Sequence, residues 1–141
     1  EHGVRQMRVL MILRELAAAG RRVLALTDFV DHCESTAADV GGLAVHGKNS
    51  GKVDAEGALA AGRVVVATHS LIREGTDWAA VDCMVFLLPP AVSALEQTVG
   101  RLRPRGDGFE PWLIDMTDVA IDEGRRASFY RRNGFTQIHE T

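Results

Sequence analysis

The sequence has little cysteine and no long apolar run. Its 141 residues include two cysteines, Cys33 and Cys83, and neither belongs to a C-x-x-C pair. This spacing excludes a disulfide scaffold and a cysteine-based zinc site, and it predicts a reducing, cytoplasmic environment. No apolar run approaches the roughly 20 residues of a membrane-spanning helix, and no signal-peptide pattern is present, so we expect no membrane partner. The chain begins with Glu1 rather than Met, and we expect it to be a fragment of a longer protein.

A strong net charge is also missing. The formal net charge is −3, which argues against a generally basic nucleic-acid binder. The arginines are nevertheless unevenly distributed, because seven of the fourteen follow residue 100. A locally basic face on a mildly acidic domain therefore remains open. The length and the apolar content of 46% predict a single globular domain over residues 1–141.

Several nucleotide-binding and catalytic motifs are absent as well. The sequence contains neither G-x-G-x-x-G nor G-x-S-x-G, and the histidines and cysteines do not have metal-ligand spacing, so no metal site is predicted. Residues 42–49 match the G-x-x-x-x-G-K part of a P-loop, but Asn49 stands where Ser or Thr is required. The intervening residues are apolar, whereas a P-loop needs a flexible turn there. We therefore reject a P-loop at this position.

Apolar runs alternate with amphipathic segments along the chain. Continuous apolar runs predict buried strands over Val23–Leu26, Leu43–His46, Arg63–Thr68, Met84–Leu88 and Trp112–Asp115. Helical spacing and end signals predict helices over Val4–Ala19, Phe29–Val40, Val53–Ala61, Ala91–Leu102 and Ile121–Arg132. Thr27 and Asp28 are expected to cap the second helix. Residues 69–77 are expected to form a polar loop.

This alternation predicts an α/β fold of three layers, with a mainly parallel sheet covered by helices on both faces. In such a sheet, ligands bind beyond the carboxyl ends of the strands. We therefore expect the polar segments that follow the strands to share one edge, with the arginine-rich stretch near it. These segments are Thr27-Asp28, residues 46–51, residues 68–77 and residues 115–118.

The stretch from Gln97 to Arg105 is the strongest functional signal. It contains three arginines within five residues, next to Gly100. A guanidinium group matches the geometry of phosphate oxygens, and glycine allows a ligand to approach the backbone. The stretch therefore predicts phosphate binding. His46 ends a predicted strand beside Gly47 and Lys48, and it is either a nucleic-acid phosphate contact or part of a loop turn.

Four segments, taken in order, resemble motifs of superfamily 2 helicases. Val23–Phe29 resembles motif IV, and His46–Lys48 resembles the loop after it. Ala67–Asp77 resembles motif V, and Gln97–Arg101 resembles the start of motif VI, whose family pattern is Q-x-x-G-R-x-x-R. The Gly-Arg-Leu-Arg-Pro sequence is similar to DEAD/DEAH-type helicases of the phage and restriction-enzyme kind. The resemblance implies the second, C-terminal RecA-like domain of such a helicase.

In that family the domain works with a partner. The core would cover residues 4–118, followed by a helix over about 120–133. The resemblance implies that an N-terminal RecA-like domain of the same protein, absent from this sequence, holds most of the ATP and Mg²⁺. Gly75, Asp77 and Gly100 would lie near the nucleotide in the cleft between the domains. The isolated domain would be inactive.

The resemblance also implies roles for individual side chains. Arg101 would act as an arginine finger on the γ-phosphate, and Gln97 would couple the nucleotide state to domain closure. Four residues would face the phosphates of a single strand: Thr27, His46, Lys48 and Thr68. DNA is favoured over RNA because of the phage and restriction-enzyme likeness.

The sequence departs from the family pattern at one position. The second arginine of motif VI is replaced by Pro104, so Arg103 or Arg105 would take its role. Arg103 is preferred because it is still within the helix-like stretch. Two other functions stay open. One is a RecA-like nucleic-acid-binding or protein-interaction module without motor activity, and the other is a small α/β enzyme for a different phosphorylated ligand.

Overall fold

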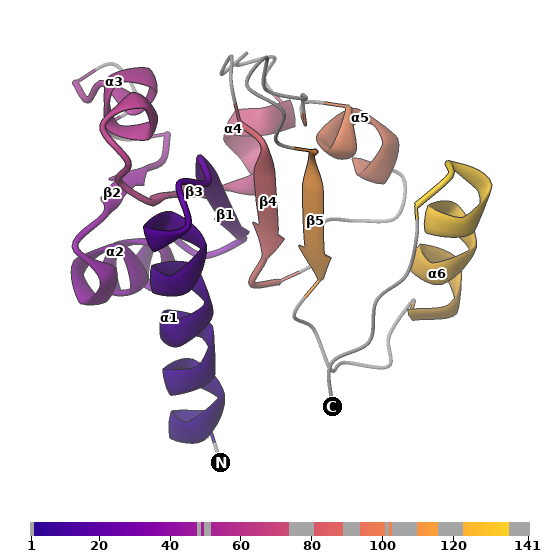
Figure 1. The fold of residues 1–141 in the computed structure, drawn as a ribbon, viewed down its shortest axis with the longest axis horizontal. Coiled ribbons are helices and arrows are strands. Elements are labelled where there is room, and N and C mark those ends of the chain that lie inside the picture. The colour runs from indigo at the N-terminus through magenta and orange to yellow at the C-terminus, as the bar shows by residue number, and fades with distance from the viewer. Residues whose placement is uncertain are drawn as a thin grey trace.

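The protein forms a parallel five-stranded sheet with helices on both of its faces. The computed structural model describes residues 2–47, 49, 52–73, 81–88, 94–100, 102, 110–115 and 123–135. The strands are β1 Val23–Thr27, β2 Leu43–Val45, β3 Val65–Thr68, β4 Cys83–Phe86 and β5 Trp112–Asp115. The helices are α1 His2–Ala18, α2 Val30–Val40, α3 Ala55–Ala60, α4 His69–Arg73, α5 Leu95–Val99 and α6 Glu123–Arg132 (Figure 1).

The strand order is β2-β3-β1-β4-β5, and every pairing between neighbours is parallel. The chain runs from the central β1 out to β2, returns through β3, and then crosses to β4 and β5 on the other side. All strands therefore end at the same edge of the sheet, which we call the carboxyl edge, and begin at the opposite amino edge. This arrangement confirms the predicted α/β class.

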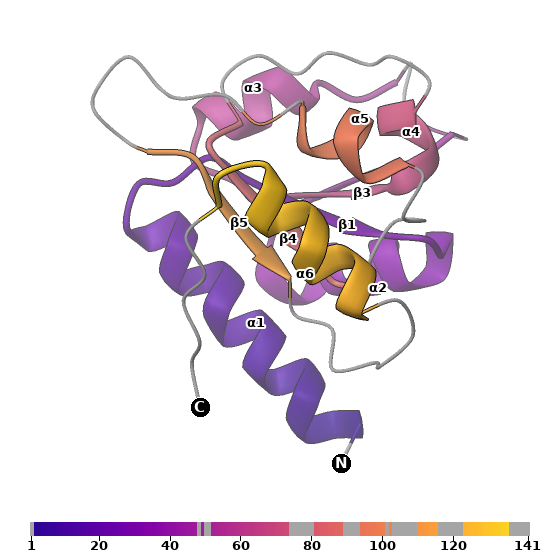
Figure 2. The same ribbon diagram turned by 90° about the vertical axis from the view of Figure 1, so that its right-hand side faces the viewer.

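Alternate residues of β1 divide the core into two clusters. Leu24 and Leu26 pack on the face covered by α3, α4, α5 and α6, whereas Val23 and Ala25 pack on the face covered by α1 and α2. In Figure 2, α3, α4 and α5 lie above the sheet and α1 lies below it. Because β1 is buried on both faces, it reads as a continuous apolar run, as expected for a central parallel strand. The three-layer prediction is confirmed.

Two local predictions were wrong. The first residue expected to cap α2 does not do so: Phe29 occupies the cap position without a side-chain cap bond, and the Thr27 hydroxyl bonds to His32 instead. The polar loop expected from residue 69 is also wrong over its first part, because His69–Arg73 forms α4. Leu71 anchors this short helix in the core at 3% exposure, a tertiary contact that local sequence does not reveal.

A network of charged side chains lies along the amino edge. Arg21 lies before β1, with its guanidinium 3.9 Å from the carboxylate of Asp82, and Asp82 is fully buried before β4. The Arg21 guanidinium also lies 4.0 Å from the centre of the Trp112 ring and donates to the Glu110 carbonyl. The network therefore joins the starts of β1, β4 and β5. Within the described part of the chain, no helix is both long and apolar enough to span a membrane.

Candidate functional site

Three of the predicted nucleic-acid contacts lie in a row along the carboxyl edge. The strand register pairs Thr27 of β1 directly with Thr68 of β3. The register of β2 pairs Val45 with Ala67, so His46 follows next to Thr68. We call Thr27, Thr68 and His46 the edge row. The prediction that these positions share one edge is confirmed, since parallel strands bring their carboxyl ends together.

Helix α2 holds both ends of the edge row. The hydroxyl of Thr27 lies 2.8 Å from Nδ1 of His32 in the first turn of α2. Nε2 of His46 lies 3.6 Å from a carboxylate oxygen of Glu34, two residues further along α2. The side chains of Thr27 and His46 are buried, at 0% and 5% exposure. These contacts fix the orientation of the Thr27 and His46 side chains.

The turn after β2 is held by Asn49. Its amide oxygen accepts from the His46 backbone N–H at 2.8 Å, and its amide nitrogen donates to the Ala44 carbonyl at 2.9 Å. The side chain thus bridges the end of the strand and the turn, which explains the asparagine where a P-loop would carry Ser or Thr. Lys48, the fourth predicted nucleic-acid contact, lies outside the described residues.

The middle of the edge row leads into α4. The Thr68 hydroxyl lies 3.2 Å from the Ser70 hydroxyl, and Thr68 is 4% exposed. His69 begins α4 and is fully buried, with Nε2 at 2.7 Å from the Leu88 carbonyl oxygen. The end of β3 is therefore connected to the segment that follows β4.

Helix α5 contains the start of the predicted phosphate-binding stretch. Leu95 and Thr98 are fully buried, and α5 packs against α4. Gln97 and Gly100 are exposed, so the predicted coupling residue and one predicted ATP-binding residue lie on the surface. The remaining predicted ATP-site residues lie outside the described residues: Gly75, Asp77, Arg101, Arg103 and Arg105.

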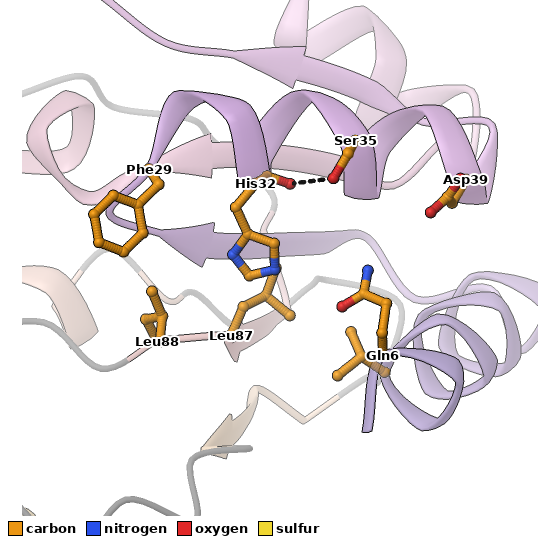
Figure 3. Close-up of a pocket in the computed structure, with 8 residues that line it drawn as sticks. Gln6, Phe29, His32, Ser35, Asp39, Leu87 and Leu88 are labelled. Atoms are coloured by element: carbon orange, nitrogen blue, oxygen red, sulfur yellow. Dashed lines mark hydrogen bonds between the residues drawn. The ribbon is translucent and has the colours of Figure 1, made fainter. Parts of the chain in front are cut away.

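A groove of about 500 Å³ runs between α1 and α2 beside the end of β1 (Figure 3). One end is apolar, and the other is polar, with His32 between them. Its lining includes Phe29, Leu87 and Leu88 at the apolar end and Gln6, Ser35 and Asp39 at the polar end. None of the described residues that line it is Lys or Arg. The groove therefore lacks a cationic side chain for a phosphate group among its described lining residues.

The cysteines do not provide a nucleophile. Burial raises the pKa of the Cys33 thiol to about 11 and that of the Cys83 thiol to about 12. Both thiols are protonated at neutral pH and lack the thiolate that reacts. Among the residues that the structure describes, no group of three or more His, Cys, Asp or Glu could hold a metal ion.

Sequence reasoning missed the residues that support the edge row, namely His32, Glu34, Asn49 and His69. Of the histidines, only His46 was considered a candidate contact. One signal was available: in a parallel sheet, the first turn of each helix after a strand lies at the carboxyl edge. Polar residues in those first turns, such as His32 and His69, are therefore candidates to contact the strand ends.

The fold is similar to that of a known helicase domain. No family model matches the chain, and no curated protein sequence matches it. Among solved structures, the helicase domain of Hef from Pyrococcus furiosus superposes with a TM-score of 0.57 at 23% identity. The match covers 89% of this chain and 27% of that one, so the chain spans about a quarter of the Hef helicase domain. The likeness shows a shared fold.

Proposed function

We propose that this chain is the C-terminal motor domain of an ATP-dependent nucleic-acid helicase or translocase. One observation carries the proposal: the edge row of Thr27, Thr68 and His46 spans three neighbouring strands of a fold shared with a helicase domain. The four segments that resemble superfamily 2 motifs follow one another along the chain in the family's order. Most of the ATP site would belong to an N-terminal RecA-like domain of the same protein.

The edge row would contact the phosphates of a single strand, together with Lys48. Hydroxyl and imidazole groups can donate to phosphate oxygens, and such contacts position a strand without reading its bases. The internal bonds to His32, Glu34 and Ser70 support this role, because they hold the polar groups in place. Single-stranded DNA is the proposed track, in preference to RNA.

The end of α5 would face the nucleotide. Its described residues are consistent with a surface that completes an ATP site held mainly by the other domain. Gln97 and Gly100 are exposed at the end of α5, directly before Arg101 in the sequence. When bound, ATP with Mg²⁺ supplies the phosphoryl group to be transferred. Arg101 would place its positive charge where negative charge develops during transfer, with Arg103 or Arg105 as a second cation. Gly75 and Asp77 would contact the nucleotide.

Replacing the proposed finger tests this function. In the full-length protein, Arg101→Ala should lower the DNA-stimulated ATPase rate by about a thousandfold or more, because positioned positive charge supplies most of the catalysis in phosphoryl transfer. ATP affinity, measured by fluorescent-nucleotide titration, should stay nearly unchanged. Arg132→Ala removes an exposed arginine of α6 and should leave both quantities at the wild-type level.

The same measurements separate the alternatives. DNA binding by a full-length protein that never hydrolyses ATP would favour a binding module without motor activity. Rapid ATP turnover by the 141-residue chain alone would contradict a shared site. Loss of folding in Arg101→Ala, seen by circular dichroism, would assign Arg101 a structural role instead.

A further inference from the structure

His69 connects the two parts of the proposed site. It directly follows Thr68 of the edge row, and it begins α4. Its fully buried ring donates from Nε2 to the Leu88 carbonyl oxygen at 2.7 Å, since a carbonyl can only accept. The ring also packs edge-on against Phe86, with the centroids 5.8 Å apart. The hydrogen bond and the ring contact together fix the orientation of His69.

The acceptor of this hydrogen bond lies on the path to α5. The backbone N–H groups of Leu87 and Leu88 both donate to the Leu26 carbonyl, which ties this segment to the end of β1. From Leu88 the chain continues to α5, which carries the exposed Gln97 and Gly100. Helix α4 also packs directly against α5. His69 thus contacts Leu88 after β4, and the helix that it begins packs against α5.

We propose that His69 is a positioning residue that couples strand binding at the edge row to the placement of α5. This inference rests on the proposed function. A strand bound against Thr68 restrains the end of β3 and the start of α4. The hydrogen bond from His69 to Leu88 fixes the start of α4, and the packing of α4 against α5 transmits that restraint to α5. The polar groups of the edge row and the residues on the nucleotide side are then positioned together.

Two amide substitutions separate the hydrogen bond from other properties of the side chain. In His69→Gln the amide nitrogen reaches about as far as Nε2 and can donate to the Leu88 carbonyl. In His69→Asn the same group is one methylene shorter and cannot reach. The readout is the ratio of DNA-stimulated to basal ATPase rates in the full-length protein, with single-stranded oligodeoxythymidylate as the DNA. A ratio is insensitive to the fraction of folded enzyme.

We expect His69→Asn to lower this ratio by about threefold to thirtyfold, the range for residues that mediate coupling between sites. His69→Gln should restore the ratio to near the wild-type value. Cys33→Ala is the matched control, because it removes a buried donor to a β3 carbonyl on the other face of the sheet, where Sγ lies 3.0 Å from the Val66 oxygen. Its ratio should equal that of the wild type.

The outcomes distinguish this inference from the proposed function. A wild-type protein without DNA-stimulated ATPase activity would contradict the proposed function itself, and the inference with it. A stimulated wild type with unchanged ratios in both His69 variants would overturn the inference alone. Equal losses in His69→Gln and His69→Asn would also overturn it, because the hydrogen bond would then not be the property that matters.

Discussion

The two edges of the sheet both bury polar side chains, but they use different chemistry. The amino edge buries a charged pair, Arg21 and Asp82, at 9% and 0% exposure. The carboxyl edge buries the hydroxyl groups of Thr27 and Thr68 and the imidazole rings of His46 and His69. The carboxylate that pairs with His46, that of Glu34, is 59% exposed. The amino-edge pair joins the starts of strands. At the carboxyl edge, Thr27 and His46 join strand ends to α2, and His69 joins the start of α4 to the segment after β4.

This difference separates stability from function. A buried charge needs an oppositely charged partner, because burying it unpaired costs several kcal/mol of folding free energy, about 3–5 kcal/mol when one partner is removed. The amino edge is therefore suited to locking three strands together and poorly suited to exchanging partners. A buried hydroxyl costs far less to rearrange. The carboxyl edge can thus exchange an internal hydrogen bond for one to a ligand, and we expect substitutions there to affect activity more than stability.

The largest expected effect is at the amino edge. Asp82→Ala should lower the free energy of unfolding by about 3 kcal/mol, because it leaves the Arg21 guanidinium buried without its carboxylate. It also removes the acceptor for the Arg22 backbone N–H, which lies 3.2 Å from the Asp82 carboxylate. Urea unfolding of the 141-residue chain, followed by circular dichroism, measures the change.

A second variant at this position separates the charge from the hydrogen bond. Asp82→Asn keeps an acceptor for the Arg22 N–H but loses the charge, so it should fall between the wild type and Asp82→Ala. Asp31→Ala removes an exposed carboxylate from α2 and should change stability by less than about 0.5 kcal/mol. If Asp82→Ala costs no more than Asp31→Ala, the charged network does not hold the amino edge.

The next largest effect concerns a close backbone approach at the same edge. A Cβ atom on Gly42 would lie 2.3 Å from the Val64 carbonyl oxygen, which also accepts from the Leu43 N–H at 2.9 Å. Gly42→Ala should therefore destabilise the chain by about 2 kcal/mol, as expected when an added carbon atom must displace neighbouring backbone. Differential scanning calorimetry should show a clear decrease in the melting temperature.

Gly47 provides the control at the carboxyl edge. A Cβ atom there would meet nothing within 4 Å, so Gly47→Ala should leave the melting temperature nearly unchanged. If Gly42→Ala and Gly47→Ala lowered the melting temperature equally, the backbone at the amino edge would not be packed more tightly than at the carboxyl edge.

The sequence was sufficient to predict the fold class and which strand ends share the carboxyl edge. Central strands are buried on both faces, so their apolar runs are visible in the sequence, and β5 was predicted with its observed bounds, Trp112–Asp115. The rule that ligands bind at the carboxyl ends of parallel strands was sufficient to bring Thr27, Thr68 and His46 to one edge. In each case the signal is local or follows directly from strand direction.

What could not be predicted depends on contacts between distant residues. Helix α4 was missed because its five residues owe their structure to the burial of His69 and Leu71, not to helical periodicity. The pairing of Arg21 with Asp82 requires knowledge that β1 and β4 are neighbours, which the order of strands along the chain does not reveal. The prediction that Thr27 caps α2 was wrong because its hydroxyl bonds to the His32 side chain instead.

The smallest stability effect, and the sharpest contrast between edges, is expected at Thr27. Thr27→Val keeps the side-chain shape but removes the hydroxyl that bonds to His32, so it should cost about 1 kcal/mol of stability. It also removes one polar group of the edge row. The affinity of the full-length protein for single-stranded oligodeoxythymidylate, measured by fluorescence anisotropy, should therefore fall about fivefold, the equivalent of one lost hydrogen bond.

Thr36→Val distinguishes a functional loss from a structural one. Thr36 is also fully buried, and its hydroxyl accepts from the Gln6 amide at 3.4 Å, but it lies in α2 and away from the edge row. We expect a similar stability cost with unchanged DNA affinity, because only Thr27 is placed to affect the bound strand. If the two variants bind DNA equally well, Thr27 serves the fold alone, and the carboxyl edge differs from the amino edge in charge but not in function at that position.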